Sequence, residues 1–367
     1  MKSSIVYLSF IVALLITQAT MLSRQVNASA PIGNQSKKLL NGLIVQRSVA
    51  ELGQIRSVAF IGHSFAWAVT LGGDLWRTQD GGQKWKELSS TDERKTVFIC
   101  ISFINSRQGW AVSADAFILN TSDGGENWSK STRLTYPESG IGIAQIVFTD
   151  KLHGWMIGGQ YYVWRTVDGG KTWELFTNWK DGICSVRRLK FYDSKNGFLA
   201  CHYNTIFRTS DGGKNWKVKE IMEGTGVVND LYFSGQLGWV VGSSSINIHH
   251  SSNNGKSWTT QLTRKTRAMA DNFESVFFLD SKRGWAAGEK YKPNGEASRG
   301  VILQTKNGGK TWAAIKTPDG LTACQWVYFG DTQRGWVVDE FSVYRTINAG
   351  KSWEKSWSVV NSARAPR

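Results

Sequence analysis

A chain of 367 residues with 18 Trp, 38 Gly and only 5 Pro combines many tight turns with large aromatic side chains, which is typical of repeated β-architectures. Its formal net charge of +15 favours an acidic protein or an anionic membrane surface as a partner. The basic residues are spread along the chain without a long basic run or arm, which argues against nucleic acid as the partner.

Residues 1–28 have the pattern of an export signal. Lys2 opens the segment, residues 5–16 are mostly apolar, and Ala28 ends a small-residue cleavage pattern. We predict cleavage after Ala28. The alternative is an uncleaved membrane anchor, since residues 5–22 approach the length of a membrane span. Residues 29–50 form a lead-in, in which residues 43–45 are a candidate strand for closing the last repeat.

From residue 51 onward the chain consists of repeats. Seven matches to the pattern [ST]-x-[DN]-x-G-x-x-W, hereafter the box, stand 41 to 45 residues apart, except for 54 residues between the fifth and the sixth. Chance matches would not keep this register, so the repeat is a structural unit. The boxes end at Trp85, Trp128, Trp173, Trp216, Trp258, Trp312 and Trp353.

Each repeat carries a second aromatic residue, which follows a short β-rich run and a turn. A third run ends in Arg-Thr or a similar pair, and a fourth carries the box Trp, which gives four short strands per repeat. Four strands in a repeat of this length predict one propeller blade. We therefore expect residues 51–360 to form one all-β domain, a seven-bladed β-propeller of four-stranded antiparallel blades, followed by a tail at residues 361–367. The second aromatic residues are Trp67, Trp110, Trp155, Phe198, Trp239, Trp285 and Trp336.

The box is expected to join the third and fourth strands as a locally closed turn. Its Asp or Asn accepts hydrogen bonds from the backbone N–H groups that follow. The second Gly of each box is expected to have positive φ. The first Gly position is expected to have an ordinary φ, because Asn254 and Ala349 occupy it in two copies.

The boxes are predicted to be structural, without catalysis or metal binding. Asn replaces Asp in three copies, which keeps the hydrogen-bond acceptor and loses the charge. Each box Trp is expected to be an apolar wedge between blades, with its indole N–H on a carbonyl. The turn-lock residues are Asp80, Asp123, Asp168, Asp211, Asn253, Asn307 and Asn348.

The four cysteines show no paired C-x-x-C spacing, which argues against a zinc site. Export would permit disulfides, but we expect free thiols buried in strands. These residues are Cys100, Cys184, Cys201 and Cys324.

Function is expected where the repeats differ, in the loops after the second and fourth strands, at the opposite end of the blades from the boxes. The longest of these loops is the insertion at residues 289–300. Arg187 and Arg188 open an inner strand, so one of them is expected to face the channel. One interpretation is a cationic face for an acidic partner; the other is scattered solvated charge, because acidic residues are interspersed. The candidate residues are Arg94, Arg133, Arg187, Arg188, Arg264, Lys265, Arg267, Lys292 and Arg299.

No motif of an enzyme is present. The sequence lacks a Gly-rich phosphate loop, an H-E-x-x-H motif and a G-x-S-x-G motif. We therefore expect a protein without catalytic activity, metal or cofactor.

The full repeat resembles that of the photosystem II stability and assembly factor family. It is carried by G109-W110-A-V with T121-S-D-G-G-E-N-W128, and by G154-W155-M-I with T166-V-D-G-G-K-T-W173, and it extends over residues 50–357. Sialidases share the box, but their Arg-Ile-Pro motif is missing here. The resemblance implies a propeller in the thylakoid lumen or periplasm that binds newly made reaction-centre subunits, with an arginine-rich surface patch.

Two alternatives remain open. A secreted glycan-binding or glycoside-hydrolase-like propeller would use loop-face carboxylates and the aromatic residues Tyr161, Tyr162 and Trp179. A structural exported protein of a non-photosynthetic bacterium would need no partner site. In the assembly-factor interpretation the partner is an acidic or membrane-embedded protein, and the propeller is a monomer. Peripheral association of the propeller with the membrane is compatible with this interpretation.

Overall fold

The computed structural model describes residues 54–88, 96–135, 142–159, 162–178, 186–201, 204–220, 226–244, 248–262, 272–291 and 297–359. All of them belong to the compact unit Glu51–Arg367. None of these segments forms a helix of the length and apolarity that a membrane crossing requires.

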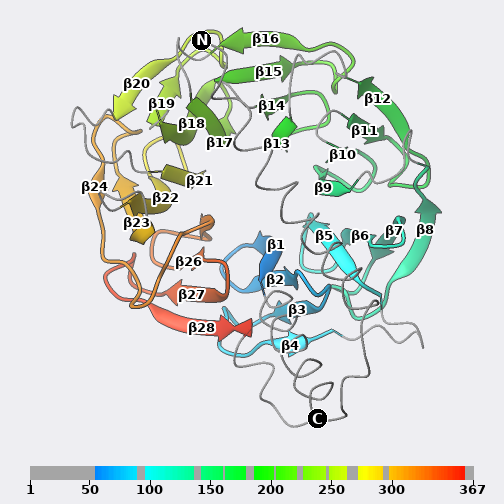
Figure 1. Cartoon of the computed structure of the whole chain (residues 1–367), viewed down its shortest axis with the longest axis horizontal. Coiled ribbons are helices and arrows are strands. Elements are labelled where there is room, and N and C mark those ends of the chain that lie inside the picture. The colour runs from blue at the N-terminus through cyan, green and yellow to red at the C-terminus, as the bar shows by residue number, and fades with distance from the viewer. Residues whose placement is uncertain are drawn as a thin grey trace, which may run out of the picture. The chain divides into compact units, whose positions relative to one another are not determined.

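The predicted all-β, seven-bladed propeller is confirmed. The described residues form seven four-stranded antiparallel sheets, each built from one repeat, and these blades follow one another around a ring (Figure 1). The innermost strands of blades 1 to 7 are β1 (Ile55–Ile61), β5 (Phe98–Phe103), β9 (Ile143–Phe148), β13 (Val186–Phe191), β17 (Gly226–Ser234), β21 (Asn272–Phe278) and β25 (Trp326–Phe329).

The other three strands of each blade follow outward in chain order. The second strands are β2 (Phe65–Thr70), β6 (Gly109–Ser113), β10 (Gly154–Gly158), β14 (Gly197–Cys201), β18 (Leu237–Ser244), β22 (Gly284–Tyr291) and β26 (Gly335–Val338). The third strands are β3 (Leu75–Thr78), β7 (Phe117–Thr121), β11 (Tyr162–Thr166), β15 (Thr205–Thr209), β19 (Ile248–Ser251), β23 (Ala297–Thr305) and β27 (Ser342–Thr346). The outer strands are β4 (Lys86–Glu87), β8 (Ser129–Arg133), β12 (Glu174–Asn178), β16 (Lys217–Glu220), β20 (Thr259–Leu262), β24 (Ala313–Ala314) and β28 (Glu354–Ser358).

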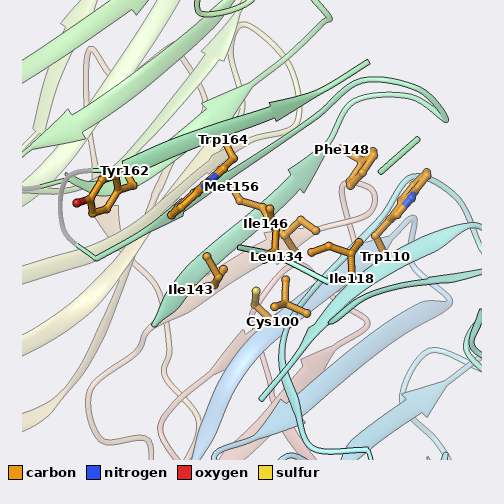
Figure 2. Packing of buried hydrophobic residues seen from close by; sticks show 11 residues of the cluster. Cys100, Trp110, Ile118, Leu134, Ile143, Ile146, Phe148, Met156, Tyr162 and Trp164 are labelled. Carbon is orange, nitrogen blue, oxygen red and sulfur yellow. The ribbon is translucent and has the colours of Figure 1, made fainter. Parts of the chain in front are cut away.

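Stacked aromatic pairs join neighbouring blades. Trp110 of blade 2 stacks on Phe148 of blade 3, with ring centroids 3.8 Å apart and planes 5° apart (Figure 2). Gly154 opens β10 because a Cβ there would lie 2.6 Å from the Phe148 ring. The equivalent pairs, with centroids 3.5 to 3.8 Å apart, are Trp67–Phe103, Trp155–Phe191, Phe198–Phe233, Trp239–Phe278 and Trp285–Phe329.

The ring is closed between blades 7 and 1 by different contacts. Trp336 meets Phe60 edge-on at 5.4 Å instead of stacking. Across the same seam, Trp85 Nε1 donates to Ser356 Oγ at 2.9 Å and Arg345 Nη1 donates to the Gly81 carbonyl at 3.2 Å. Each sheet of the described residues is complete from a single repeat, and the proposed closing strand at residues 43–45 lies outside the described residues.

The boxes lock the turns between third and fourth strands as predicted. In blade 3, Asp168 Oδ1 accepts hydrogen bonds from the backbone N–H groups of Lys171 and Thr172, both at 3.0 Å. Thr166 Oγ1 accepts from Gly170 N at 3.0 Å, which closes the turn from inside. In the Asn copies the amide also donates to a hydroxyl four residues on, as Asn348 does to Ser352 at 2.7 Å.

The predicted role of the box indole N–H groups is wrong in most copies. Trp353 Nε1 donates to the Lys316 carbonyl at 2.8 Å, and Trp85 Nε1 donates to a hydroxyl. The tryptophans instead pack edge-on against the inner Phe of their own blade, as Trp173 does on Phe148 with centroids 5.9 Å apart. Packing of the ring therefore decides the indole position, and in four copies the N–H has no partner: Trp128, Trp173, Trp258 and Trp312.

The expectation of an ordinary φ at the first Gly position is wrong. This residue has positive φ in all seven boxes, including 57° at Asn254 and 62° at Ala349. Its N–H reaches back to a carbonyl in the turn between the first and second strands, as Ala349 N does to Gln333 O at 2.8 Å. That bond requires the left-handed conformation, and the rest of the box imposes it even on Ala. The second Gly has positive φ throughout, as predicted.

Replacing Ala349 by Gly is expected to raise the free energy of unfolding by about 1 kcal/mol, because the left-handed conformation disfavours a residue with a Cβ and the greater freedom of unfolded Gly offsets part of the gain. Urea unfolding followed by Trp fluorescence measures the change. Ala313→Gly in the exposed β24, where φ is not positive, is the control and should destabilise. A destabilised Ala349→Gly variant would contradict the argument.

The box carboxylates are expected to make stability depend on acidic pH. Burial alone would raise the pKa of Asp123, Asp168 and Asp211, but the hydrogen bonds within the boxes outweigh it and lower each pKa from 3.8 to about 2. A lowered folded-state pKa means that this stabilisation is present above the unfolded pKa and is lost as pH falls from about 4 to about 2. The triple Asp→Asn variant, which copies blades 5 to 7, should lose part of this slope in pH-dependent urea titrations; an unchanged slope would refute the assignment.

The predicted free thiols are confirmed for two cysteines and wrong for a third. Cys100 and Cys324 are free and buried. Burial raises the pKa of Cys100 to about 12, which makes this thiol unreactive. Cys201 is disulfide-bonded, and Cys184 lies outside the described residues. The spacing of cysteines along the sequence does not reveal which side chains meet in space, so it could not predict this bond.

Candidate functional site

The topology gives the ring two distinct faces. The boxes and the turns between first and second strands lie at one end of the blades, hereafter the box face, and are joined there by the N–H groups of the first Gly positions. The connections between second and third strands and between blades lie at the other end, hereafter the loop face. The predicted positions of boxes and loops are thus confirmed.

The sixth-repeat insertion lengthens a hairpin on the loop face. It was expected as a loop, but the strand pairing of β22 with β23 continues through Glu289 opposite Gly300 and Lys290 opposite Arg299. Gly300 lies close to the connection between blades 6 and 7, because a Cβ there would be 2.5 Å from the Thr322 carbonyl. The described ends of the insertion therefore lengthen the β22–β23 pairing.

A β-bulge recurs in the inner strands of blades 1 to 6, where one residue has no partner on the second strand. Bulges of this kind change the direction of a side chain. The bulge stands four residues before the inner Phe of the strand, toward the loop-face end. The bulge residues, hereafter the bulge ring, are Arg56, Ile99, Ala144, Arg187, Asn229 and Glu274.

The bulge ring adjoins a cavity of about 230 Å³ on the channel axis. Arg56 and Arg188 both line it, from blades 1 and 4, together with the uncharged Gln145 and Ser102. The expectation that one of Arg187 and Arg188 faces the channel is therefore confirmed for Arg188. Arg56 was missed, although it stands at the same position of its repeat as Arg187, four residues before the inner Phe; aligning the inner strands would have found it.

Arg188 is held by the neighbouring inner strand. Its Nε donates to the Asn229 carbonyl at 3.3 Å and lies 3.7 Å from Asp230 Oδ1. Lys190 Nζ lies 3.3 Å from the same oxygen. Asp230 is 4% exposed, and its Oδ2 accepts from Val276 N at 3.1 Å, so this carboxylate links blades 4, 5 and 6.

The acidic groups beside the bulge ring are also engaged. Glu274 Oε2 lies 3.6 Å from Arg187 Nη2, and its Oε1 accepts from Asn272 Nδ2 at 2.7 Å. The same amide nitrogen is 3.2 Å from Glu289 Oε1, and Glu289 also accepts from the Tyr291 hydroxyl. In the part of the chain that the structure describes, Arg56 has no acidic partner. The loop-face end of the channel at the bulge ring, hereafter the channel mouth, therefore carries the positive charge of Arg56 on the blade 1 side.

The other candidate residues fall on separate blades. Arg133 is exposed at the end of β8, with its guanidinium 5.8 Å from the Phe117 ring centre. Arg299 is exposed on β23 of blade 6. The structure therefore brings together Arg187 and Arg188 only. The remaining candidates lie outside the described residues: Arg94, Arg264, Lys265, Arg267 and Lys292.

The described residues give little support to a carbohydrate site or a metal site. Tyr162 is 1% exposed inside the core between blades 2 and 3, so it cannot stack on a sugar as the glycan interpretation required. Tyr161 and Trp179 lie outside the described residues. Within the described segments no three His, Cys, Asp or Glu side chains are placed to hold a metal ion. What the channel mouth can do chemically is bind a carboxylate or phosphate through guanidinium groups.

Comparisons with known proteins agree with this fold. The model of the family "Photosynthesis system II assembly factor YCF48" matches residues 47–137 and 182–267, which contain blades 1, 2, 4 and 5. The chain resembles the photosystem II assembly factor YCF48 family in sequence and in fold. Arg56, Arg187 and Arg188 lie inside the matched segments. No curated protein sequence matches the chain.

Solved structures show the same fold at low identity. A structure described as YCF48 bound to D1 peptide is 20% identical, with a TM-score of 0.62, covering 81% of this chain and 94% of that one. YCF48 from Cyanidioschyzon merolae is 17% identical, with a TM-score of 0.61, covering 81% and 96%. The GH74 xyloglucanase of Xanthomonas campestris is 12% identical, with a TM-score of 0.65, but only 55% of that chain is covered.

Proposed function

We propose that this protein is a non-catalytic assembly factor that binds newly made photosystem II reaction-centre subunits. The family match over four of the seven blades carries the proposal. The related YCF48 structure holds a D1 peptide, and D1 is a reaction-centre subunit, which supports a polypeptide segment as the ligand. The export pattern of residues 1–28 supports a location in the thylakoid lumen or periplasm.

The channel mouth on the loop face is the proposed contact surface. Arg56 lines the cavity there and Arg187 belongs to the adjoining bulge ring, on two blades that both lie in matched segments, and Arg56 has no acidic partner among the described residues. Exposed guanidinium groups bind carboxylates in two-pronged geometry and steer acidic partners over a distance. Glu274 and Glu289 are tied to Asn272, Arg187 and Tyr291, which supports a scaffold role for them rather than acid–base catalysis.

Affinity capture of solubilised thylakoid proteins by the full chain tests this function. We expect recovery of reaction-centre subunits at low salt and their loss as salt is raised, since exposed charges are screened. Direct titration with synthetic peptides from the lumenal segments of D1 gives the affinity. Failure to recover any reaction-centre subunit at low salt would overturn the proposal, and cleavage or binding of xyloglucan would favour a carbohydrate function instead.

The double variant Arg56→Glu/Arg187→Glu is expected to weaken peptide binding by about tenfold or more, because both attraction and charge-assisted hydrogen bonds are lost. The control is Lys310→Glu/Lys351→Glu, which makes the same change of net charge at exposed box positions. Circular dichroism establishes that both variants are folded. Equal weakening in the two variants would mean that net charge, and not the channel mouth, attracts the peptide.

A further inference from the structure

The seams between blades share one hydrogen bond at the box face. The indole N–H of the second aromatic residue donates to the carbonyl of the first Gly position in the next box. In blade 4 the indole is replaced by Phe198, which has no N–H. The bonded pairs are Trp67 with Gly124 at 2.9 Å, Trp110 with Gly169 at 2.8 Å, Trp155 with Gly212 at 3.1 Å and Trp239 with Gly308 at 3.2 Å.

The seam between blades 6 and 7 departs from this pattern. Trp285 is 1% exposed, and its Nε1 has no hydrogen-bond partner. A cavity of about 460 Å³ lies at this seam, and both Trp285 and Ala349 line it. Ala349 is the residue equivalent to the accepting glycines, so both residues of the usual hydrogen bond line this cavity, and the Trp285 N–H lacks its usual acceptor. The partnerless box tryptophans do not line this cavity.

The neighbouring seam also has a cavity at its box-face end. Between blades 7 and 1, a cavity of about 260 Å³ is lined by Trp336 and Gly81. There Arg345 Nη1 donates to the Gly81 carbonyl at 3.2 Å, as Arg77 Nη1 does to the Gly124 carbonyl at 3.0 Å, and the equivalent residue of blade 6 is the uncharged Gln304, which lines the Trp285 cavity. At the seam between blades 6 and 7, no described residue accepts a hydrogen bond from the Trp285 N–H. A buried donor without an acceptor is costly.

The charged groups around the Trp285 cavity are mostly cationic. Lys282 and Lys306 are exposed at its rim, and neither has an acidic partner among the described residues. The one carboxylate of the lining, Asp280, is already engaged by Arg283 Nε at 2.6 Å and by the backbone N–H groups of Lys282 and Arg283 at 2.8 Å. The charged lining of the cavity therefore has an excess of positive charge.

We propose that the cavity between blades 6 and 7 is a binding site for a carboxylate, which accepts the Trp285 N–H and pairs with Lys282 and Lys306. Its volume falls in the range of small-ligand sites, about 300 to 1,000 Å³. The carboxylate belongs either to a small free dicarboxylate or to an acidic side chain of a peptide. The site lies on the box face, so it is independent of the channel mouth and of the proposed function.

Nuclear magnetic resonance of the full chain with ¹⁵N-labelled tryptophan tests the site through the Trp285 indole signal. Trp285→Phe assigns this signal by its loss, and Phe198 shows that blade 4 accepts Phe at the same position. Glutarate and a blocked Glu-Glu peptide are the two probes. We expect at least one of them to shift the signal saturably, and Lys282→Ala/Lys306→Ala to weaken that binding by about tenfold, since two charge-assisted contacts are lost.

Lys310→Ala/Lys351→Ala is the control, because it removes the same charge from exposed residues that do not line the cavity. Binding of glutarate would identify a small-molecule site, and binding of the peptide alone would identify a protein ligand. The proposal is overturned if neither probe moves the Trp285 signal, or if the two double variants weaken binding equally. Either result leaves the test at the channel mouth unaffected.

Discussion

Replacing Trp110 by Ala is expected to lower the free energy of unfolding by about 4 kcal/mol, because large-to-small changes of buried aromatic residues leave a cavity. Trp110 is 5% exposed, stacks on Phe148 at 3.8 Å and donates its indole N–H to Gly169 of the next blade. Its removal therefore takes away two of the contacts between blade 2 and blade 3, and leaves a cavity in the cluster that Figure 2 shows. Urea unfolding monitored by circular dichroism measures the loss.

The chain offers its own control for this substitution. Phe198 occupies the equivalent position in blade 4 and stacks on Phe233 at 3.5 Å without an indole N–H. Trp110→Phe should therefore keep the stack, lose one hydrogen bond, and cost about 1 to 2 kcal/mol. If Phe and Ala were equally destabilising, the stack would not be the main contribution at this seam.

Replacing Asp230 by Ala is expected to cost about 2 kcal/mol, because a buried backbone N–H loses its acceptor and two partly exposed cations lose their counter-charge. The carboxylate accepts from Val276 N at 3.1 Å, and Arg188 and Lys190 approach its other oxygen. Val276 N loses its acceptor, and two cations of the inner strand β13 lose their counter-charge. Thermal and urea unfolding of the full chain measure the effect.

Asp230→Asn separates the two contributions. The amide oxygen can still accept from Val276 N, while the negative charge is lost, so we expect roughly half of the effect of Ala. In blade 6 the equivalent residue is Ser275, whose hydroxyl oxygen accepts a hydrogen bond from Val327 N at 3.2 Å. An uncharged side chain can therefore make this hydrogen bond. If Asp230→Ala left the free energy of unfolding unchanged, the ion pairs would contribute nothing to stability.

The disagreements between sequence and structure have one physical origin. The left-handed φ of Ala349 and the partnerless N–H of Trp128 both depend on what the adjoining strand or blade presents. The bulge that turns Arg56 toward the channel depends on pairing with β2, and the burial of Tyr162 on packing between blades. A residue type and its spacing do not contain that information.

The sequence by itself determined the number of blades, their four strands, the box turns and the resemblance to the assembly-factor family, because each box closes through hydrogen bonds between residues no more than four positions apart. Only the tertiary structure decided which charged side chains meet. Arg188 and Asp230 are 42 residues apart, and Trp285 faces Ala349 across a seam between blades. Such pairs are set by how one blade packs on the next.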